Sequence, residues 1–137
     1  MAYTIRQVDY FYTTVQDRPG EAYKVLSGLA DSGVNLLAFT AFPIGQLRTQ
    51  LALFPEDTAT LRATAAKIGM QIDGPLSALL VQGDSEMGAL VQIHETLYEA
   101  RVNVYGSNGV TDGKGGYGYI VYLRPDDYER AAAALGI

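Results

Sequence analysis

The feature that most constrains the fold is an internal duplication. When Gly20 is aligned with Gly88, the same offset of 68 residues brings together positions of the same character along most of the chain. The matched pairs include Leu29 with Leu97, Val34 with Val102, Asn35 with Asn103, and Leu53 with Val121. A repeat of this length is a small domain and not a solenoid unit. The sequence therefore predicts two similar units, residues 1–74 and 75–137.

Two such units are expected to share an interface. The chain has 137 residues, of which 48% are hydrophobic and 18% are charged, which is an ordinary globular composition. A unit of about 60 to 70 residues buries only about 60% of its unfolded surface and is marginal alone. We therefore expect packing between units, within the chain or across a homodimer.

Charge and composition argue against several classes of partner and cofactor. The net charge is −5 and the ten basic residues are scattered, so no basic stripe is present for nucleic acid. Cysteine is absent, which removes disulfides, thiolates and cysteine metal sites. The sequence begins without an apolar signal core and has no apolar run that could span a bilayer. We expect a cytoplasmic protein with no membrane, nucleic-acid, metal or cofactor partner.

Each half is predicted to run strand, helix, strand, strand, helix, because apolar spacing alternates between periods of two and 3.6. The expected elements of the first half are a strand over 8–15, a helix from Gly20 to Gly33, strands over 34–42 and 47–54, a helix over 57–69 and a short strand over 70–73. Those of the second half are a strand over 77–82, a helix over 88–100, strands over 102–105 and 118–123, and a helix over 126–135. Gly74-Pro75 is interpreted as the linker between the halves, and Ser107 to Gly116 as a flexible hairpin tip.

This order is the ferredoxin-like βαββαβ plan, an α+β fold with an antiparallel sheet and both helices on one face, and two such units are expected to pack side by side. The second half ends at Ile137 without a final strand. Residues 3–7 could supply that strand, because the extended stretch from Tyr3 to Val15 is long for one strand. A frayed N-terminus is the alternative.

No catalytic constellation is found, so the chain is predicted not to be an enzyme. The single histidine, His94, lies beside a helix stripe and is interpreted as a partly buried helix residue. The carboxylates at 56–57 and 126–127 precede helices, where negative charge is stabilising without any catalytic role. The glycine-rich segment 106–116 lacks the spacing of a phosphate-binding loop.

The turn before the first helix of each half is the best candidate for a binding site. Free N–H groups at a helix start bind carboxylate, glycine lets a ligand approach, and a nearby aspartate could take an ammonium. Such a turn also has a purely structural explanation, with Pro19 opening a helix and Gly20 chosen for packing. On the residues alone the two interpretations stay open.

The segment Asp17-Arg18-Pro19-Gly20, a helix, and then Gly33-Val34-Asn35-Leu36 resembles the signature of the ACT domain, a regulatory amino-acid-binding module. Gly20 to Ser27 is similar to the G-A-L-x-K-V-L-S helix start of ACT domains in prephenate dehydratases and aromatic amino acid hydroxylases. Residues 88–91 match the G-A-L-V form, so the resemblance covers both halves. In place of the E-S-R-P segment of those families the chain has Thr40-Ala41-Phe42-Pro43, which does not favour phenylalanine as the ligand.

The resemblance implies a sensor that binds an amino acid or related metabolite in the seam between ACT units. The residues expected to line the ligand site are Asp17, Arg18, Pro19, Gly20, Asn35, Leu36, Asp84, Gly88, Ala89, Asn103 and Val104. The two asparagines offer both donors and acceptors to a zwitterion, or they close the helix-to-strand turns and do nothing more. A homodimer and a biosynthetic enzyme are the implied partners. The alternative function is an assembly or docking module that binds no ligand.

Overall fold

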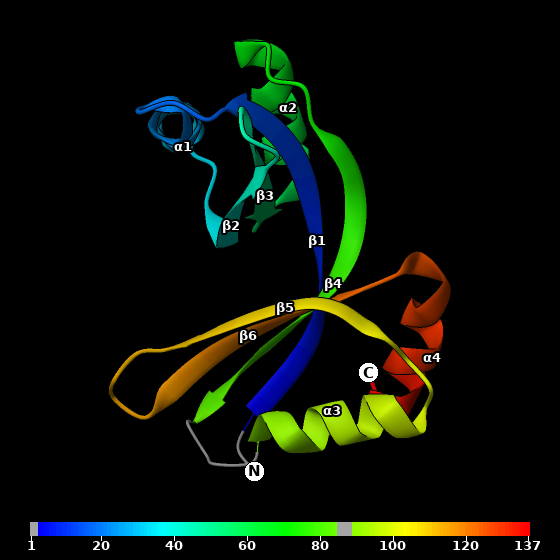
Figure 1. Cartoon of the computed structure of the whole chain (residues 1–137). Coiled ribbons are helices and arrows are strands. Elements are labelled where there is room, and N and C mark those ends of the chain that lie inside the picture. Colours follow the sequence, from blue (N-terminus) through cyan, green and yellow to red (C-terminus); the bar gives the residue numbers. More distant parts are fainter. Residues whose placement is uncertain (1–2, 85–88) are drawn as a thin grey trace. The chain divides into compact units, whose positions relative to one another are not determined.

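The computed structural model describes residues 3–84 and 89–137. Ten elements follow in order: β1 (Tyr3–Gln16), α1 (Glu21–Asp31), β2 (Leu36–Ile44), β3 (Arg48–Pro55), α2 (Thr58–Ile68), β4 (Asp73–Asp84), α3 (Ala89–Glu99), β5 (Val104–Thr111), β6 (Gly116–Leu123) and α4 (Pro125–Leu135). Figure 1 labels them. The helices and strands make an α+β chain whose two units have ferredoxin-like βαββαβ order, as the sequence predicted.

The chain divides into two compact units, one of residues 9–76 and one that joins residues 3–8 to 77–137. The sequence had suggested a single cut, at residue 74. The two long strands β1 and β4 explain the difference, because each of them runs from one unit into the other. Each unit is described by itself below.

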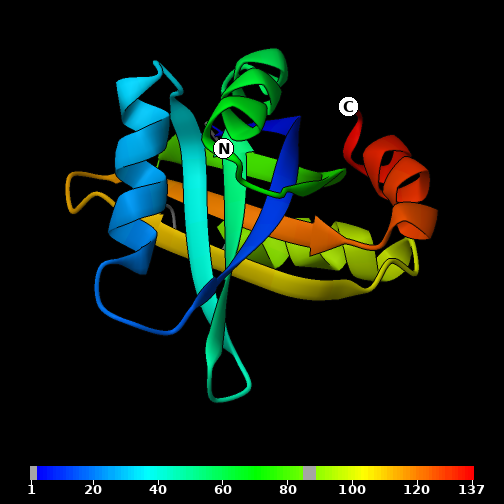
Figure 2. The ribbon, with the colours of Figure 1, turned by 90° about the horizontal axis from the view of Figure 1, so that it is seen from above.

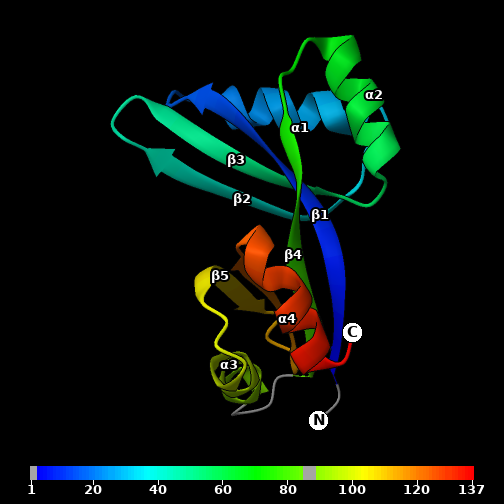
Figure 3. The same cartoon turned by 90° about the vertical axis from the view of Figure 1, so that its right-hand side faces the viewer.

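In the unit of residues 9–76 the strands lie in the order β2-β3-β1-β4. Helices α1 and α2 lie together along this part of the sheet, as Figures 2 and 3 show. The core consists of Phe11, Leu29, Val34, Leu51, Leu53 and Leu61. Both helices contribute to it, β1 and β3 contribute the strand residues, and Val34 comes from the segment between α1 and β2. Alternate strand residues share one face of a sheet, so the two helices cover the same face.

The helix ends of this unit follow from their local sequence. The side chain of Asp57 accepts a hydrogen bond from the backbone N–H of Ala59 at 3.1 Å and so caps α2, as expected for a carboxylate at that place. Gly69 ends α2 in the left-handed conformation, with φ of 73°. These residues fix where α2 starts and stops, and the predicted helix over 57–69 is confirmed.

In the other unit the order is β1-β4-β6-β5, and residues 3–8 provide the strand that the C-terminal half lacks. The Thr4 hydroxyl donates to the carbonyl of Gln82 at 3.4 Å, and the Gln7 amide donates to the Ser77 hydroxyl at 2.9 Å. Tyr3 and Ile5 pack against a core made of Leu79, Val81, Ile93, Leu97, Val102, Tyr119, Val121, Leu123 and Ala131. Residues 3–8 of β1 therefore complete the four-stranded part of the sheet in the unit of residues 77–137.

The duplication is visible in individual bonds. The backbone N–H of Val34 bonds to the carbonyl of Leu29, and that of Val102 bonds to the carbonyl of Leu97, both at 2.9 Å. Cross-strand pairs correspond as well: Phe11 faces Leu53 in one unit, and Leu79 faces Val121 in the other. All four of these side chains are fully buried. The two units thus share both topology and register.

Three sequence predictions about irregular segments were wrong. Gly74-Pro75 is not a linker, because it lies inside β4, and residues 70–72 are not a strand. The expected loop over 107–116 is mostly strand: β5 continues to Thr111 and β6 begins at Gly116. Glycines carry no side-chain alternation, so this part of β5 gave no strand signal.

Candidate functional site

The turn that precedes α1 has the geometry of an open helix start. Gly20 occupies the N-cap position with φ of 88°, a left-handed conformation that glycine adopts without strain, and no side chain caps α1. The backbone N–H of Asp17 bonds to the carbonyl of Leu47 at 2.9 Å, which ties the turn to the β2–β3 hairpin. The backbone N–H of Glu21 bonds to the carbonyl of Arg18 at 3.3 Å. The other N–H groups of a first helical turn have no partner inside the helix, so a start without a side-chain cap favours an anionic ligand.

An ion pair lies beside this helix start. Nε and Nη2 of Arg18 donate to Oε1 of Glu21 at 3.2 and 2.7 Å. These hydrogen bonds hold the pKa of the Glu21 carboxyl below its usual value. The side chain of Arg18 remains 63% exposed, so it can meet a ligand while it is paired with Glu21. Pro19 follows it at an exposed position.

Asn35 and Leu36 lie at the opposite end of α1. The helix has eleven residues, which is about 16 Å at 1.5 Å per residue. Within this unit the structure therefore does not bring Asn35 or Leu36 to the turn at 17–20. The backbone carbonyl of Asn35 instead accepts from the N–H of Glu56 at 2.9 Å, which joins the start of β2 to the end of β3.

A polar hollow of about 190 Å³ lies at this second place, and we call it the acidic hollow. It is lined by Gly33, Val34, Asn35, Glu56, Asp57 and Thr60. The carboxylate of Asp57 is occupied, since it accepts from Ala59 and from the Thr60 hydroxyl at 2.8 Å. Glu56 takes part in no ion pair among residues 3–84 and 89–137. The hollow suits a small cationic group.

The expected site residues of the other unit are spread over three places. Asp84 ends β4 and is exposed, and α3 begins at Ala89. Gly88 lies outside the described residues. Asn103 is exposed just before β5, and Val104, which is half-buried, begins that strand opposite Leu123.

His94 is the partly buried helix residue that the sequence predicted. Its Nε2 and the hydroxyl of Tyr119 are hydrogen-bonded at 2.6 Å, which joins α3 to β6. Tyr119 itself packs against Gly109, where a Cβ would lie 2.8 Å from the ring. Among the described residues no group of three or more histidine, aspartate or glutamate side chains could hold a metal ion. The pair is a structural contact between a helix and the sheet.

The hairpin between β5 and β6 closes on one carboxylate. Asp112 accepts from the backbone N–H of Lys114 at 2.6 Å and from that of Gly116 at 3.0 Å. These two bonds hold the pKa of Asp112 below its usual value. The tip is therefore a four-residue turn stabilised by hydrogen bonds to Asp112, and its side chains show no phosphate-binding arrangement.

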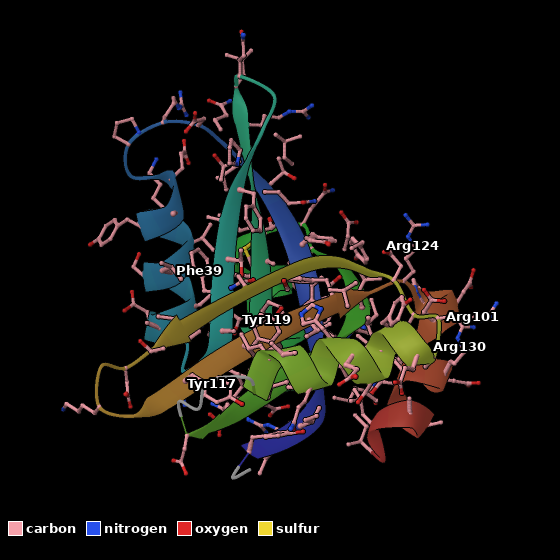
Figure 4. The ribbon with its side chains drawn as sticks, turned by 60° about the horizontal axis from the view of Figure 1, so that its bottom comes forward. Phe39, Arg101, Tyr117, Tyr119, Arg124 and Arg130 are labelled. Atoms are coloured by element: carbon pink, nitrogen blue, oxygen red, sulfur yellow. The ribbon has the colours of Figure 1, made fainter. Side chains whose placement is uncertain are left out.

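Sequence reasoning missed a group of three arginines, which we call the arginine corner. Arg101, Arg124 and Arg130 gather where α3 ends and α4 begins, as Figure 4 shows. Arg130 donates to the carbonyls of Ala100 at 3.0 Å and Arg101 at 3.1 Å. Two signals were present in the repeat: Arg101 aligns with Gly33, and Arg124 takes the place of the helix cap Asp57.

No protein-family model matches the sequence, and no curated protein matches it either. Solved structures do match its fold. Protein BT0572 from Bacteroides thetaiotaomicron superimposes with a TM-score of 0.81 at 13% identity, over 96% of this chain and 88% of that one. The regulatory subunit of aspartate kinase from Thermus thermophilus, in a ligand-free form, gives a TM-score of 0.63 at 18% identity, over 99% and 95% of the two chains.

A further structure, described as a putative C-terminal regulatory domain of aspartate kinase from Porphyromonas gingivalis, gives a TM-score of 0.58 at 12% identity, over 98% and 94% of the chains. The likeness extends over nearly the whole chain in each case, so both units are included. The chain has the ACT-like α+β fold of these regulatory subunits. In the described part of the chain no helix is both long enough and apolar enough to cross a membrane.

Proposed function

We propose that this chain is a non-catalytic sensor that binds an amino acid or related metabolite at an interface between ACT-type units. The observation that carries the proposal is the fold, which nearly the whole chain shares with regulatory subunits of aspartate kinase. For this chain the two ACT-type units, a homodimer, a biosynthetic enzyme as partner and a cytoplasmic location belong to the same proposal.

The open start of α1 supports a carboxylate-binding role. Gly20 leaves the helix without a side-chain cap, and Arg18 adds a positive charge beside it. A ligand carboxylate there would gain charge-assisted hydrogen bonds from N–H groups. Asp17 is close enough in sequence to take the ammonium group of the same ligand.

The test is isothermal titration calorimetry with the twenty amino acids, followed by substitutions. Binding with micromolar to millimolar Kd is expected for at least one of them. Asn35→Ala combined with Asn103→Ala should weaken that binding by about tenfold, which corresponds to 1.4 kcal/mol. Asn108→Ala is the matched control, because Asn108 is also exposed but belongs to no proposed site. Absence of heat and of any thermal shift with all twenty would contradict the proposal.

An assembly or docking module is the second candidate function. Exposed apolar side chains on α3 favour it: Val91 is 67% exposed and Tyr98 is 80% exposed, and they lie seven residues apart on one face of the helix. This function predicts capture of a partner enzyme with no response to any amino acid. Substitution of both residues by serine would then abolish capture and leave ligand titrations unchanged.

A further inference from the structure

The acidic hollow and the arginine corner occupy corresponding places in the two units. Each lies where the first helix of its unit turns into a strand and the second helix begins. The backbone N–H of Gly33 bonds to the carbonyl of Ala30, and that of Arg101 bonds to the carbonyl of Tyr98, both at 3.0 Å. The backbone frames correspond, so the difference between the two places is in their side chains.

Those side chains differ in charge at two positions. Gly33 corresponds to Arg101, and the N-cap of α2, Asp57, corresponds to the N-cap of α4, Arg124. Glu56 adds a second carboxylate to the hollow, and Arg130 adds a third guanidinium to the corner. One place is therefore acidic where the other carries arginines.

Both Arg101 and Arg124 are poor choices for local structure. Arg101 has φ of 60° and is the only non-glycine residue with positive φ among those described. A side chain in this region costs about 1–2 kcal/mol relative to glycine. Arg124 places a cation at the positive end of a helix and makes no capping bond, where Asp57 makes one. Two adjacent departures from local preference indicate a role outside the unit.

Neighbouring acids do not neutralise these two arginines. Asp127 pairs with Arg130 at 2.7 Å, and that pair and Arg18–Glu21 are the ion pairs of the described residues. The other acids in this region of the chain are Glu99, Asp126 and Glu129, and none of them forms an ion pair with Arg101 or Arg124 within the described ranges. The two guanidinium groups thus remain available to a partner.

We propose that the arginine corner of one copy of this chain binds the acidic hollow of a second copy. A hollow of about 190 Å³ is smaller than pockets for drug-sized ligands, which are about 300–1,000 Å³, and it suits a single side-chain head group. Arginine forms bidentate hydrogen bonds with carboxylates, so the contact would have a defined geometry in addition to the attraction between opposite charges. The whole chain carries −5, so two copies repel each other on average, and a local pairing of opposite charges would offset that repulsion where they meet.

The repeat itself supplies variants that test the contact without harming the fold. Arg101→Gly and Arg124→Asp each install the residue of the other unit, so they should keep or raise the melting temperature. Both should weaken self-association at least tenfold in sedimentation equilibrium at low salt. Glu56→Lys should weaken it equally from the other side. Lys114→Asp, in the β5–β6 hairpin, is the control for a charge reversal elsewhere.

Mixing two variants with opposite charge reversals gives the decisive measurement. The Glu56→Lys and Arg124→Asp variants should associate with each other more tightly than either does with itself, because the reversed charges then match. The association of the natural chain should weaken as salt rises from 50 to 500 mM. The proposal is overturned if the natural chain is monomeric up to millimolar concentration or if the substitutions leave self-association unchanged. It is also overturned if the mixed variants associate no more tightly than each variant does with itself. Glu56→Lys and Arg124→Asp replace none of the residues expected to line the ligand site, so the calorimetric screen on these two variants tells a failure of this contact apart from a failure of amino-acid binding.

Discussion

The strand formed by residues 3–8 should stabilise the unit of residues 77–137 and not the unit of residues 9–76. Ile5 packs against the core that contains Leu79 and Val81. Replacing a fully buried isoleucine by alanine costs about 2–5 kcal/mol, and Ile5 is half-buried, so Ile5→Ala should cost about 1–2 kcal/mol. A domain of 60 to 100 residues loses about 4–8 °C per kcal/mol, which gives a fall of roughly 4–16 °C for this unit.

The assay combines calorimetric melting with amide hydrogen exchange. In Ile5→Ala the amides of Leu79 and Val81 should exchange faster, while those of Leu51 and Leu53, in the other core, should keep their protection. Deleting residues 1–7 should enlarge the same selective loss. Arg6→Ala, at an exposed position of the same strand, should stay within about 0.5 kcal/mol of the natural chain.

The reasoning is refuted if Ile5→Ala behaves like its control, or if the deletion leaves the melting curve unchanged. A uniform loss of protection over both cores would refute it as well. In that case the strand would stabilise the chain as a whole, and the division into two units would have no energetic meaning.

Further variants test single contacts. Tyr119→Phe should lower the free energy of unfolding by about 1–3 kcal/mol, because it leaves His94 without its hydrogen-bond partner. Adding His94→Leu should recover part of that loss in urea titrations. Strictly additive losses in the double variant would contradict this. Gly74→Ala should lower the free energy of unfolding by about 1–3 kcal/mol, since the φ of Gly74 is 137° and a Cβ there would lie 2.9 Å from a backbone oxygen. Gly118→Ala is the control, because a Cβ at Gly118 would meet no atom within 4 Å. Equal melting temperatures of the two variants would refute the steric argument. The lowered pKa of Asp112 means that its contribution to hairpin stability is complete above the ordinary aspartate pKa, about 3.9, and is lost as pH falls through the lower folded value. NMR shifts of the hairpin amides should follow that loss, and a titration that Asp112→Asn leaves intact would contradict it.

The regular elements could be predicted from the sequence because their signals are local. Helix α2 was found from Asp57 at its start and Gly69 at its end, and both residues cap it as expected. The repeat predicted that Leu53 and Val121 would be equivalent, and both are fully buried at the same register. Capping and periodicity act within a few residues, so one sequence is enough to recognise them.

The remaining features depend on contacts between distant parts of the chain. Gly106 and Gly109 belong to a strand because each lies against a tyrosine ring of β6, a contact that no local pattern reveals. Gly74-Pro75 has the composition of a turn, yet it lies within β4, where a Cβ on Gly74 would lie 2.9 Å from the backbone oxygen of Tyr10 in β1. The arginine corner was overlooked because no sequence motif marks it. It stands out only when Arg101 and Arg124 are compared with Gly33 and Asp57, the corresponding residues of the other unit.

The path of the chain has a consequence for its synthesis. Residues 9–76 form a complete unit inserted into another unit, whose first strand is made early and whose remaining elements are made last. At about 5–20 residues per second, residues 3–8 wait several seconds on the ribosome before residues 77–84 emerge to pair with them. During that time the inserted unit can fold first, and the early strand is an unsatisfied edge that other chains could capture.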